Sequence, residues 1–346
     1  MTTILGISDG HDPGACFIND EKIVSCFWEN KLENKDRVSG FPYLSIKKIL
    51  ERHDLRSGNI DIVAYTDTWG RLPFRILNKF YRGTTPASDT ESMANKIALI
   101  YQNGIYYLPV IRKLESFLSK KVITKRLEKM NIRPKKMITV THHIAHAYAA
   151  YEDSQKDALL ITLDGYGDGL SGQIGFYKDK RFITIVSFPF WNSLGLLYGA
   201  LTSMLGYKEG EESRTMELAK KGDPNSAYLT VKRFIWLENS SIRTKTFLWK
   251  KQLSSLLKAY SPEDIAASVQ KRVEEVVIAL INSFIQTTHK DKLCCSGGVF
   301  SNTLLVEKIK VLKNLQSVHV ADFPGDKGIC IGTALAAYYN NTLCTY

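Results

Sequence analysis

Short apolar runs with β-type composition occur in two similar units, one near the N-terminus and one in the middle of the chain. Residues 2–28 contain an apolar strand ending in Asp-Gly, a glycine-rich turn, a second strand, a charged tight turn and a third strand. Residues 158–188 repeat this plan about 155 residues later. β-Branched and aromatic residues fill the strands, and Gly, Asp and Asn fill the turns. The repeat predicts a duplicated fold of two lobes with a cleft between them.

Stretches with helical spacing of apolar residues lie between these units. The pattern predicts a helix over 41–53, a buried strand over 61–66, a helical insert over about 70–132, and a strand that runs into a helix over 137–151. The insert is interrupted by residues 81–92, which we expect to form a mobile loop.

The second half of the chain continues as helices and strand–helix pairs. An amphipathic helix is predicted over 191–207, and a longer helix over 261–286 begins with Ser-Pro-Glu-Asp, which combines capping residues with Pro in the first turn. Strand–helix pairs follow at 291–309 and 317–339. Strands that alternate with helices favour a largely parallel sheet that is covered on both faces.

Together these elements predict an α/β protein with a duplicated mixed-sheet core. We expect an N-terminal lobe over 1–155, which carries the helical insert, and a C-terminal lobe over 156–346. The last helix is a candidate to pack back on the first lobe. Apolar residues make up 44% of the chain, which is enough to form a core in each lobe.

Two features predict a cytoplasmic protein without a membrane segment. The N-terminus lacks a basic stretch followed by an apolar one, so no secretory signal is expected. No run approaches about 18 uncharged apolar residues, the length that a membrane helix needs. The six cysteines lie in apolar segments without CxxC spacing, which predicts reduced and mostly buried thiols.

Positive charge is concentrated in one segment of a chain whose net charge is +11. Residues 112–136 hold ten Lys and Arg against Glu115 and Glu128, a net charge of +8. Such a field attracts nucleic acid, anionic substrates or an acidic partner. The alternative is a helix face exposed to water, which we favour because Phe117 is the single aromatic residue among the charges. We therefore do not expect nucleic acid to be the main partner.

His142 and His146 are the strongest candidates for metal ligands. If this segment is helical, both imidazoles lie on one face at a spacing that can bind one metal ion, and His143 points elsewhere. No Glu follows His142, so the pattern is not that of the HExxH zinc proteases. A third ligand must come from far away in sequence, and Asp326, in a turn before a helix, is the best candidate, although such an Asp can also simply cap the helix. Two histidines and one carboxylate would leave open positions for a substrate oxygen.

Two glycine-rich turns are candidates for a phosphate or nucleotide site. Gly297 and Gly298 follow an apolar strand and open a helix, where backbone N–H groups suit a phosphate or ribose, although tight packing explains the pair equally well. The turn at 164–172 alternates glycines with Asp164 and Asp168, so that N–H groups can hold a phosphate while carboxylates hold a metal-bound water or an acceptor hydroxyl. The corresponding turn of the first unit is expected to face it across the cleft with three polar residues, Asp9, His11 and Asp12.

Eight segments follow one another along nearly the whole chain: LGISDGHDPGAC, FPYLSI, HHIAHAYAAY, LLITLDGYGD, SLGLLYGALTSMLGY, KEGEESRTMELAKKGDP, SGGVFSN and PGDKGICIGTALAA. Together they resemble the O-carbamoyltransferase family known from nodulation-factor and antibiotic biosynthesis. The N-terminal domain of that family is related to the enzyme that places threonylcarbamoyl on tRNA adenosine. Eight segments in the same order make this resemblance more specific than any single segment.

The resemblance implies a two-lobed, actin-like (ribonuclease H-like) ATPase fold that binds ATP or a carbamoyl-adenylate between its lobes. Its metal site, usually assigned to iron or another divalent metal, would consist of His142, His146 and Asp326. Its aspartates near the acceptor would be Asp12 and Asp164, and we expect one or the other to accept the proton of the hydroxyl. With the turn at 164–172, the residues expected to hold the nucleotide are Gly165, Gly167, Gly297, Gly298, Val299 and Asn302.

The implied activity is metal-assisted transfer of a carbamoyl group from carbamoyl-adenylate to a hydroxyl of a small-molecule acceptor. Family members carry a further C-terminal domain that makes carbamoyl-adenylate, and no such domain follows before Tyr346. We therefore expect a separate protein to supply the adenylate, or the chain to use a pre-made one or to have lost the activity. Two residues depart from the family pattern: Arg214 stands in place of a lysine, and Glu217 in place of a glycine. These changes affect the contacts that residues 212–222 would make with the acceptor or a phosphate.

Two alternatives remain open at this point. One is an enzyme similar to the tRNA threonylcarbamoyl transferases, which the basic segment favours. The other is a nucleotide-binding subunit without complete catalysis, which the departures at 212–222 and the shorter length favour.

Overall fold

The computed structural model describes residues 1–35, 38–55, 59–66, 72–77, 108–152, 157–208, 210–245 and 249–339. The loop predicted at 81–92 lies outside these residues.

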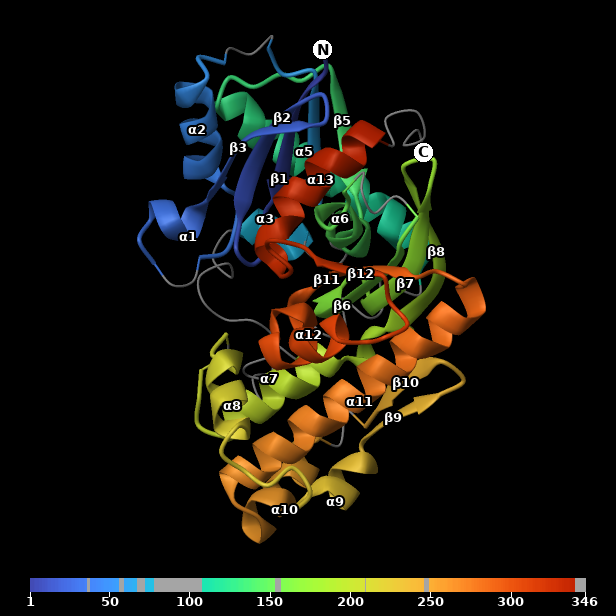
Figure 1. Ribbon diagram of the computed structural model, residues 1–346. Helices are drawn as coiled ribbons and strands as arrows, with labels where there is room; N and C mark the ends of the chain where they lie inside the picture. The colour runs from blue at the N-terminus through green and yellow to red at the C-terminus, as the bar shows by residue number, and fades with distance from the viewer. Residues whose placement is uncertain are drawn as a thin grey trace.

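Each lobe is built on a five-stranded mixed sheet, and both sheets have the same strand order (Figure 1). The first sheet consists, from edge to edge, of β3 (Lys22–Trp28), β2 (Gly14–Asn19), β1 (Thr3–Ser8), β4 (Ile62–Thr66) and β5 (Lys136–Val140). The second consists of β8 (Arg181–Pro189), β7 (Leu170–Lys178), β6 (Leu159–Gly167), β11 (Lys292–Ser296) and β12 (Ser317–Val320). In each, the three strands of the sequence unit are antiparallel, and two later strands join in parallel. The predicted α/β fold with a duplicated mixed-sheet core is confirmed.

The helix after each fifth strand crosses to the other lobe. α6 (His142–Ala149) follows β5 but packs on β6, β7, β8 and β11 of the second sheet. α13 (Ile329–Tyr339), which follows the 3-10 turn η6 (Asp326–Gly328), packs on β1, β2 and β4 of the first sheet, as Figure 1 shows. The two helices also pack closely on each other, since a Cβ at Gly332 would lie 1.8 Å from the carbonyl oxygen of Ala145. Each helix therefore joins the sheet of one lobe to that of the other.

The first lobe carries the helices α1 (Glu29–Leu32), α2 (Tyr43–Arg52), α3 (Leu72–Leu77) and α5 (Pro109–Lys129). A buried ion pair attaches α3 to the end of β1: Arg75 Nε lies 2.7 Å from Asp9 Oδ2, and Arg75 Nη2 lies 2.9 Å from Asp9 Oδ1. Arg126 on α5 donates in turn to the carbonyl of Arg75. The hydrogen bonds join α3, α5 and the first turn into one packed unit.

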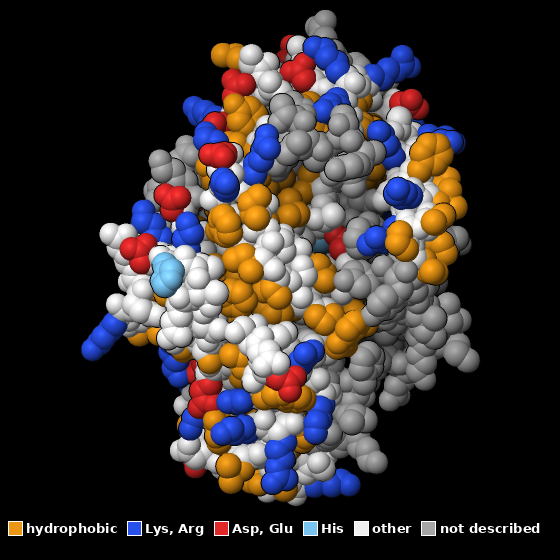
Figure 2. Space-filling model, turned by 90° about the vertical axis from the view of Figure 1, so that its right-hand side faces the viewer, with side chains coloured by type: hydrophobic (Ala, Val, Ile, Leu, Met, Phe, Trp, Pro, Cys, Tyr) orange, Lys and Arg blue, Asp and Glu red, His pale blue; other side chains and the backbone are white. Residues whose placement is uncertain are grey.

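The basic segment lies on α5 and the turn that follows it. Its lysines at 113, 120, 121, 125 and 129 are exposed, as a water-facing helix surface predicts. Arg126 is an exception to that prediction, because it is buried and packs over the ring of Phe41. On the face shown in Figure 2, Lys and Arg side chains are spread from one end of the molecule to the other with acidic side chains among them.

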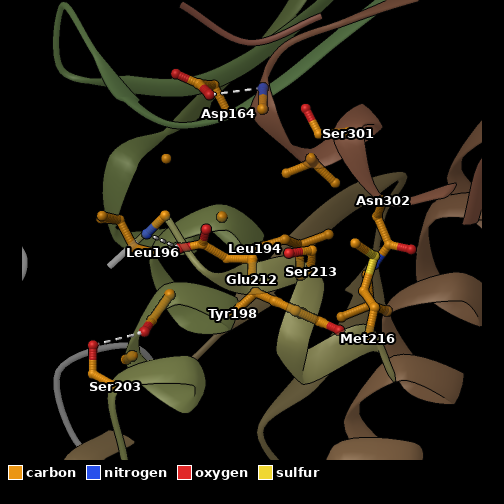
Figure 3. A pocket seen from close by; sticks show the side chains of 18 residues that line it. Asp164, Leu194, Leu196, Tyr198, Ser203, Glu212, Ser213, Met216, Ser301 and Asn302 are labelled. Carbon is orange, nitrogen blue, oxygen red and sulfur yellow. Dashed lines mark hydrogen bonds between the residues drawn. The ribbon is translucent and has the colours of Figure 1, made fainter. Parts of the chain in front are cut away.

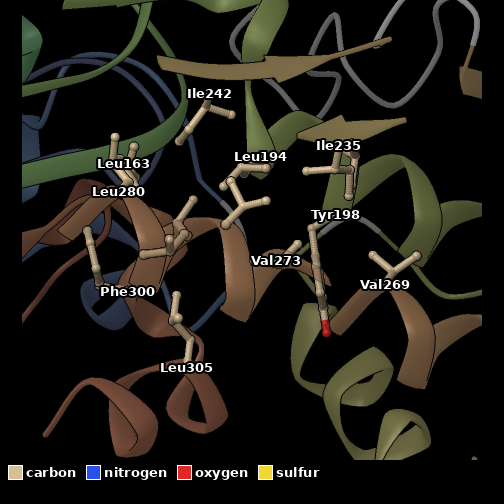
Figure 4. Close-up of a cluster of buried hydrophobic side chains, with 14 of the residues drawn as sticks. Leu163, Leu194, Tyr198, Ile235, Ile242, Val269, Val273, Leu280, Phe300 and Leu305 are labelled. Atoms are coloured by element: carbon tan, nitrogen blue, oxygen red, sulfur yellow. The ribbon is translucent and has the colours of Figure 1, made fainter. Parts of the chain in front are cut away.

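The second lobe adds helices and a small hairpin around its sheet. They are η3 (Phe190–Asn192), α7 (Leu194–Met204), α8 (Glu212–Ala219), α9 (Tyr228–Lys232), β9 (Ile235–Glu238), β10 (Ser241–Thr244), α10 (Trp249–Ala259), α11 (Pro262–Thr288), η5 (Gly298–Ser301) and α12 (Thr303–Lys310). The hydroxyl of Ser261 accepts the N–H of Asp264 at 3.1 Å, which caps α11 where the sequence predicts its start. The apolar faces of α7 and α11 form the core of this lobe against β6 and η5 (Figure 4).

The described cysteines are free thiols: Cys16, Cys294, Cys295 and Cys330 are buried, and Cys26 is half-buried, in agreement with the prediction. Cys344 lies outside the described residues. Within the described part of the chain, no helix is both long and apolar enough to cross a membrane.

Candidate metal and nucleotide site

Two histidines one helical turn apart begin the candidate site. β5 ends directly before α6, so that His142 is the first residue of the helix and His146 follows on the same face. Their Nε2 atoms are 3.1 Å apart, and both side chains are buried. His143 points elsewhere, as the helical spacing predicts, and its Nδ1 lies 3.1 Å from Thr162 Oγ1. The structure therefore places two imidazole nitrogens next to each other.

Two carboxylates from the second lobe meet these nitrogens. Asp164 Oδ2, from β6, lies 3.1 Å from His142 Nε2 and 3.7 Å from His146 Nε2. Asp326 Oδ1, from η6, lies 3.8 Å and 3.7 Å from the same two atoms. The four ligand atoms lie within 4.8 Å of one another. Two imidazoles and two carboxylates are a donor set that suits divalent transition metals, so these residues fit the metal that the resemblance implies.

Surrounding groups orient the histidines. Asp168 Oδ2 accepts the backbone N–H of His142 at 2.6 Å, so it caps α6 from the other lobe. Ser296 Oγ lies 3.4 Å from His146 Nδ1, on the side of the ring away from the cluster. Gly167 packs against the ring of His142, where a Cβ would lie 2.1 Å from the ring. Such partners fix ring orientation in metal sites.

The charges of the cluster are strongly coupled. Burial opposes a charge on His146, but hydrogen bonds to Asp164 and Asp326 outweigh burial and raise its pKa to about 9. Burial likewise opposes ionisation of Asp164, yet the histidines hold the pKa of that carboxyl well below its usual range. Burial lowers the pKa of His143 to about 3, which keeps this ring neutral. A metal cation at the cluster would replace the proton that His146 otherwise holds.

A pocket of about 460 Å³ opens beside the cluster (Figure 3). A hydrogen bond connects the cluster to the pocket wall, because Asp164 Oδ1 accepts the N–H of Gly298 at 2.8 Å. Gly297 precedes this contact with a φ of 98°, and a Cβ there would lie 2.1 Å from the carbonyl oxygen of Leu163. The Gly-Gly turn is thus needed for close packing of η5 against β6, and it leaves Gly298 at the pocket wall.

The predicted nucleotide residues divide into two groups. Those that line the pocket are Gly165, Gly298, Val299 and Asn302. The other two are not among its lining: Gly167 packs on the ring of His142, and Gly297 packs on the backbone of Leu163. Both ends of the Asn302 amide already have protein partners. Its Nδ2–H donates to Gln270 Oε1 at 2.8 Å, and its Oδ1 accepts the N–H of Leu305 at 3.1 Å and Nε2–H of Gln270 at 3.0 Å. Figure 3 shows this oxygen turned away from the cavity.

Asp12 is neither one of the four residues of the described cluster nor among the residues that line this pocket. It sits in the turn between β1 and β2 with a φ of 47°. Asp9, in the same turn, forms an ion pair with Arg75, and the backbone of His11 forms a single antiparallel β-bridge with Ser39. The role of Asp12 near an acceptor remains a prediction.

Several pocket residues were not singled out from the sequence. Tyr198 and the glycines of α7 form one wall, and Glu212, Ser213 and Met216 of α8 form another. The departures from the family lie on the outer side of α8: Arg214 pairs with Glu211 at 3.4 Å, and Glu217 pairs with Lys220 at 2.6 Å. The family motif at 208–224 covers this region. Separating its pocket-facing positions from its exposed ones would also have required assigning residues 212–219 to a helix and following the helical period.

Comparison with known proteins shows the family of this chain. The family model described as "Carbamoyltransferase N-terminus" matches residues 3–335. The nodulation protein NolNO of Sinorhizobium fredii is 25% identical over 339 residues, which cover 94% of this chain and 46% of that protein. An uncharacterized protein of Methanocaldococcus jannaschii is 27% identical over 345 residues, which cover 96% of this chain and 57% of that protein. This chain thus spans about half the length of the curated relatives it matches.

This chain also has a weaker similarity to a tRNA-modifying enzyme. The tRNA N6-adenosine threonylcarbamoyltransferase of Borrelia garinii is 28% identical over 207 residues, which cover 57% of this chain and 60% of that protein.

Solved structures agree on the fold. Full-length HypF in its phosphate- and nucleotide-bound form superposes with a TM-score of 0.56 at 16% identity, over 98% of this chain and 55% of that one. Component A of the (R)-2-hydroxyglutaryl-CoA dehydratase of Acidaminococcus fermentans superposes with a TM-score of 0.53 at 15% identity, over 99% of this chain and 100% of that one. The chain has the actin-like ATPase fold, and it belongs to the carbamoyltransferase family through that family's N-terminal domain.

Proposed function

We propose that this chain transfers a carbamoyl group from carbamoyl-adenylate to a hydroxyl of a small-molecule acceptor, with a divalent metal such as iron at the histidine cluster. The single observation that carries the proposal is the carboxylate of Asp164. One of its oxygens lies 3.1 Å from His142 Nε2 and 3.7 Å from His146 Nε2, and the other accepts the Gly298 N–H at 2.8 Å. The position of the metal and the pocket of the nucleotide are therefore neighbours. A cytoplasmic location is part of the proposal.

The residues divide the work as follows. His142, His146, Asp164 and Asp326 would hold the metal, which when bound supplies a Lewis acid for phosphate and carbonyl oxygens. The pocket between α7, α8 and η5 would hold the adenosine part of the adenylate. Because the mixed anhydride is already activated, the protein has mainly to position it and to exclude water.

The transfer step balances without an oxidant or reductant. The acceptor oxygen bonds to the carbamoyl carbon, the bond from that carbon to the phosphate oxygen breaks, and AMP leaves. A carboxylate takes the proton of the acceptor hydroxyl. We assign this role to Asp12, because Asp164 in this proposal is a metal ligand and the acceptor of the Gly298 N–H.

A tRNA acceptor is the second candidate. The exposed lysines of α5 and the similarity to tRNA threonylcarbamoyltransferases favour it. The longer match to the nodulation protein NolNO, 339 residues against 207, favours the small-molecule acceptor.

The test supplies synthetic carbamoyl-adenylate and a small-molecule extract of cells to the metal-loaded chain. Mass spectrometry should find a new carbamoylated compound, and chromatography should find AMP in equal amount. Asp12→Asn should slow transfer by about 10²- to 10⁴-fold, the usual contribution of a general base. Glu217→Gln, on the outer side of α8, is the matched control and should keep the rate.

Two results would count against the proposal. Consumption of carbamoyl-adenylate no faster than in buffer would reject the activity. A full transfer rate in the Asp12→Asn variant would reject Asp12 as the proton acceptor and leave the activity in place.

A further inference from the structure

Trp28 connects the first lobe to the loop that carries Asp326. It is the last residue of β3, and its indole Nε1–H donates to the carbonyl oxygen of Lys327 at 2.9 Å. Its ring also packs on Phe323, with ring centroids 4.8 Å apart. The contact joins residues 299 positions apart, between an edge strand of one lobe and η6 of the other.

Hydrogen bonds hold the Asp326 loop to both lobes. On its own lobe, the carbonyl of Pro324 accepts the N–H of Gly297 at 2.6 Å. On the other lobe, the carbonyl of Lys327 accepts the indole N–H of Trp28. Asp326 lies between these two carbonyls, and its Oδ1 reaches His146 Nε2 at 3.7 Å. The loss of either hydrogen bond would therefore free the backbone on one side of this carboxylate.

Trp28 is also built into the turn that carries Asp12. It pairs with Gly14 in the sheet, where a Cβ on the glycine would lie 2.8 Å from Trp28 Cδ1. The next residue, Glu29, donates its backbone N–H to the carbonyl of Pro13 at 2.9 Å. The Trp28 side chain thus contacts the loop of a candidate metal ligand and Gly14, which directly follows the turn of the candidate proton acceptor, and the backbone after Trp28 bonds to that turn.

We propose that Trp28 is a positioning residue that holds the Asp326 carboxylate at the cluster and couples its position to the Asp12 turn. Tryptophan suits this task because it combines a large packing surface with an N–H donor at one edge. Outer contacts that orient metal ligands typically change metal affinity by 10- to 100-fold. The inference rests on the metal site of the proposed function, but its test does not need the transfer reaction.

The first measurement is Co²⁺ binding to the metal-free chain. Titration gives the affinity, and the d–d absorption spectrum reports the ligand geometry. Trp28→Phe keeps most of the packing but removes the N–H, and it should weaken Co²⁺ binding by about 10-fold and alter the spectrum at saturation. Trp28→Leu, which also removes the ring contact with Phe323, should weaken binding further. Trp236→Phe makes the same chemical change in β9, outside the cluster, and should leave affinity and spectrum unchanged.

The second measurement is hydrogen exchange of the peptide covering residues 10–16, with and without Co²⁺. Metal should slow exchange of this turn in the natural chain and should have no such effect in Trp28→Phe. If the Trp28 variants fail to fold, Phe323→Ala removes the aromatic contact that Trp28→Leu also removes, from a residue that is 38% exposed, and it should weaken Co²⁺ binding and reduce the metal-induced protection.

The outcomes separate the two proposals. Failure of the natural chain to bind Co²⁺ would reject the metal site of the proposed function and this inference with it. Normal Co²⁺ affinity and spectrum in Trp28→Phe, with binding in the natural chain intact, would reject the inference alone. Metal-induced protection of residues 10–16 that persists in Trp28→Phe would reject the coupling between the two loops.

Discussion

The carboxylate of Asp164 accepts the backbone N–H of Gly298 at 2.8 Å and approaches His142 Nε2 at 3.1 Å with its other oxygen. The same side chain is thus shared by the candidate metal cluster and the turn that opens the pocket. Because a carboxylate with two fixed partners cannot rotate freely, a change at one site should be felt at the other. This relationship makes the chemistry of the two sites testable together.

The purified chain should carry about one divalent transition metal, and the double variant His142→Ala, His146→Ala should carry none. Asp164→Asn can keep its acceptor oxygen toward Gly298 while losing the charge toward the histidines, so it should weaken metal binding at least about 10-fold. Metal content by elemental mass spectrometry checks both. The neighbouring change His143→Gln is the control, because that ring faces Thr162. Full metal occupancy in the double variant would contradict the cluster.

The stability of the metal-free chain should fall as the pH rises from 6.5 to 9. The pKa of His146 is raised from 6.5 to about 9 in the folded state, so its proton stabilises the fold below pH 6.5, and this contribution is lost as the pH passes through 9. Metal affinity should rise over the same range, because the metal must displace that proton. Urea unfolding at several pH values measures the first effect, and His146→Gln should flatten it. Equal stability of the natural chain at both ends of the range would contradict the charge state assigned to His146.

Arg75→Met should lower the free energy of unfolding by about 3–5 kcal/mol, because it removes the guanidinium that pairs with the buried carboxylate of Asp9. The additional change Asp9→Leu should restore much of the loss. Lys135→Met breaks an exposed pair with Asp61 and should cost less than about 1 kcal/mol. Chemical denaturation measures all three variants. Equal effects of the Arg75 and Lys135 changes would show that the buried pair contributes no more than a surface one.

Changing Lys120, Lys121, Lys125 and Lys129 to Glu should leave carbamoyl transfer unchanged. Arg126 is kept, because it is buried and donates to the carbonyl of Arg75. We expect tRNA to bind weakly and to dissociate near physiological salt, with a log–log slope of roughly −0.7 for each phosphate contacted. Filter binding across a salt series measures this slope. Tight, salt-resistant tRNA binding that is lost in the quadruple variant would favour the tRNA acceptor instead.

Local patterns in the sequence were sufficient to predict the two strand units, the free thiols and the histidine pair. The Asp-Gly turns after β1 and within β6 occupy corresponding positions in sheets of identical order, as the repeat predicts. The spacing of His142 and His146 was also decisive, because residues four apart on a helix lie on one face in any fold. Such features depend on residues close in sequence.

Tertiary structure alone decided how these parts meet. The crossing of α6 and α13 between lobes, the arrival of Asp164 beside the histidines, and the contact of Trp28 with Lys327 all join distant segments. The same holds for charge: Arg126 stands in a basic run, yet the packing of α3 against α5 buries it. Helical and strand periods are properties of a short stretch of backbone, so they can be seen in the sequence. Which distant residues meet depends instead on how the whole chain folds to bury its apolar surface while its buried polar groups stay paired.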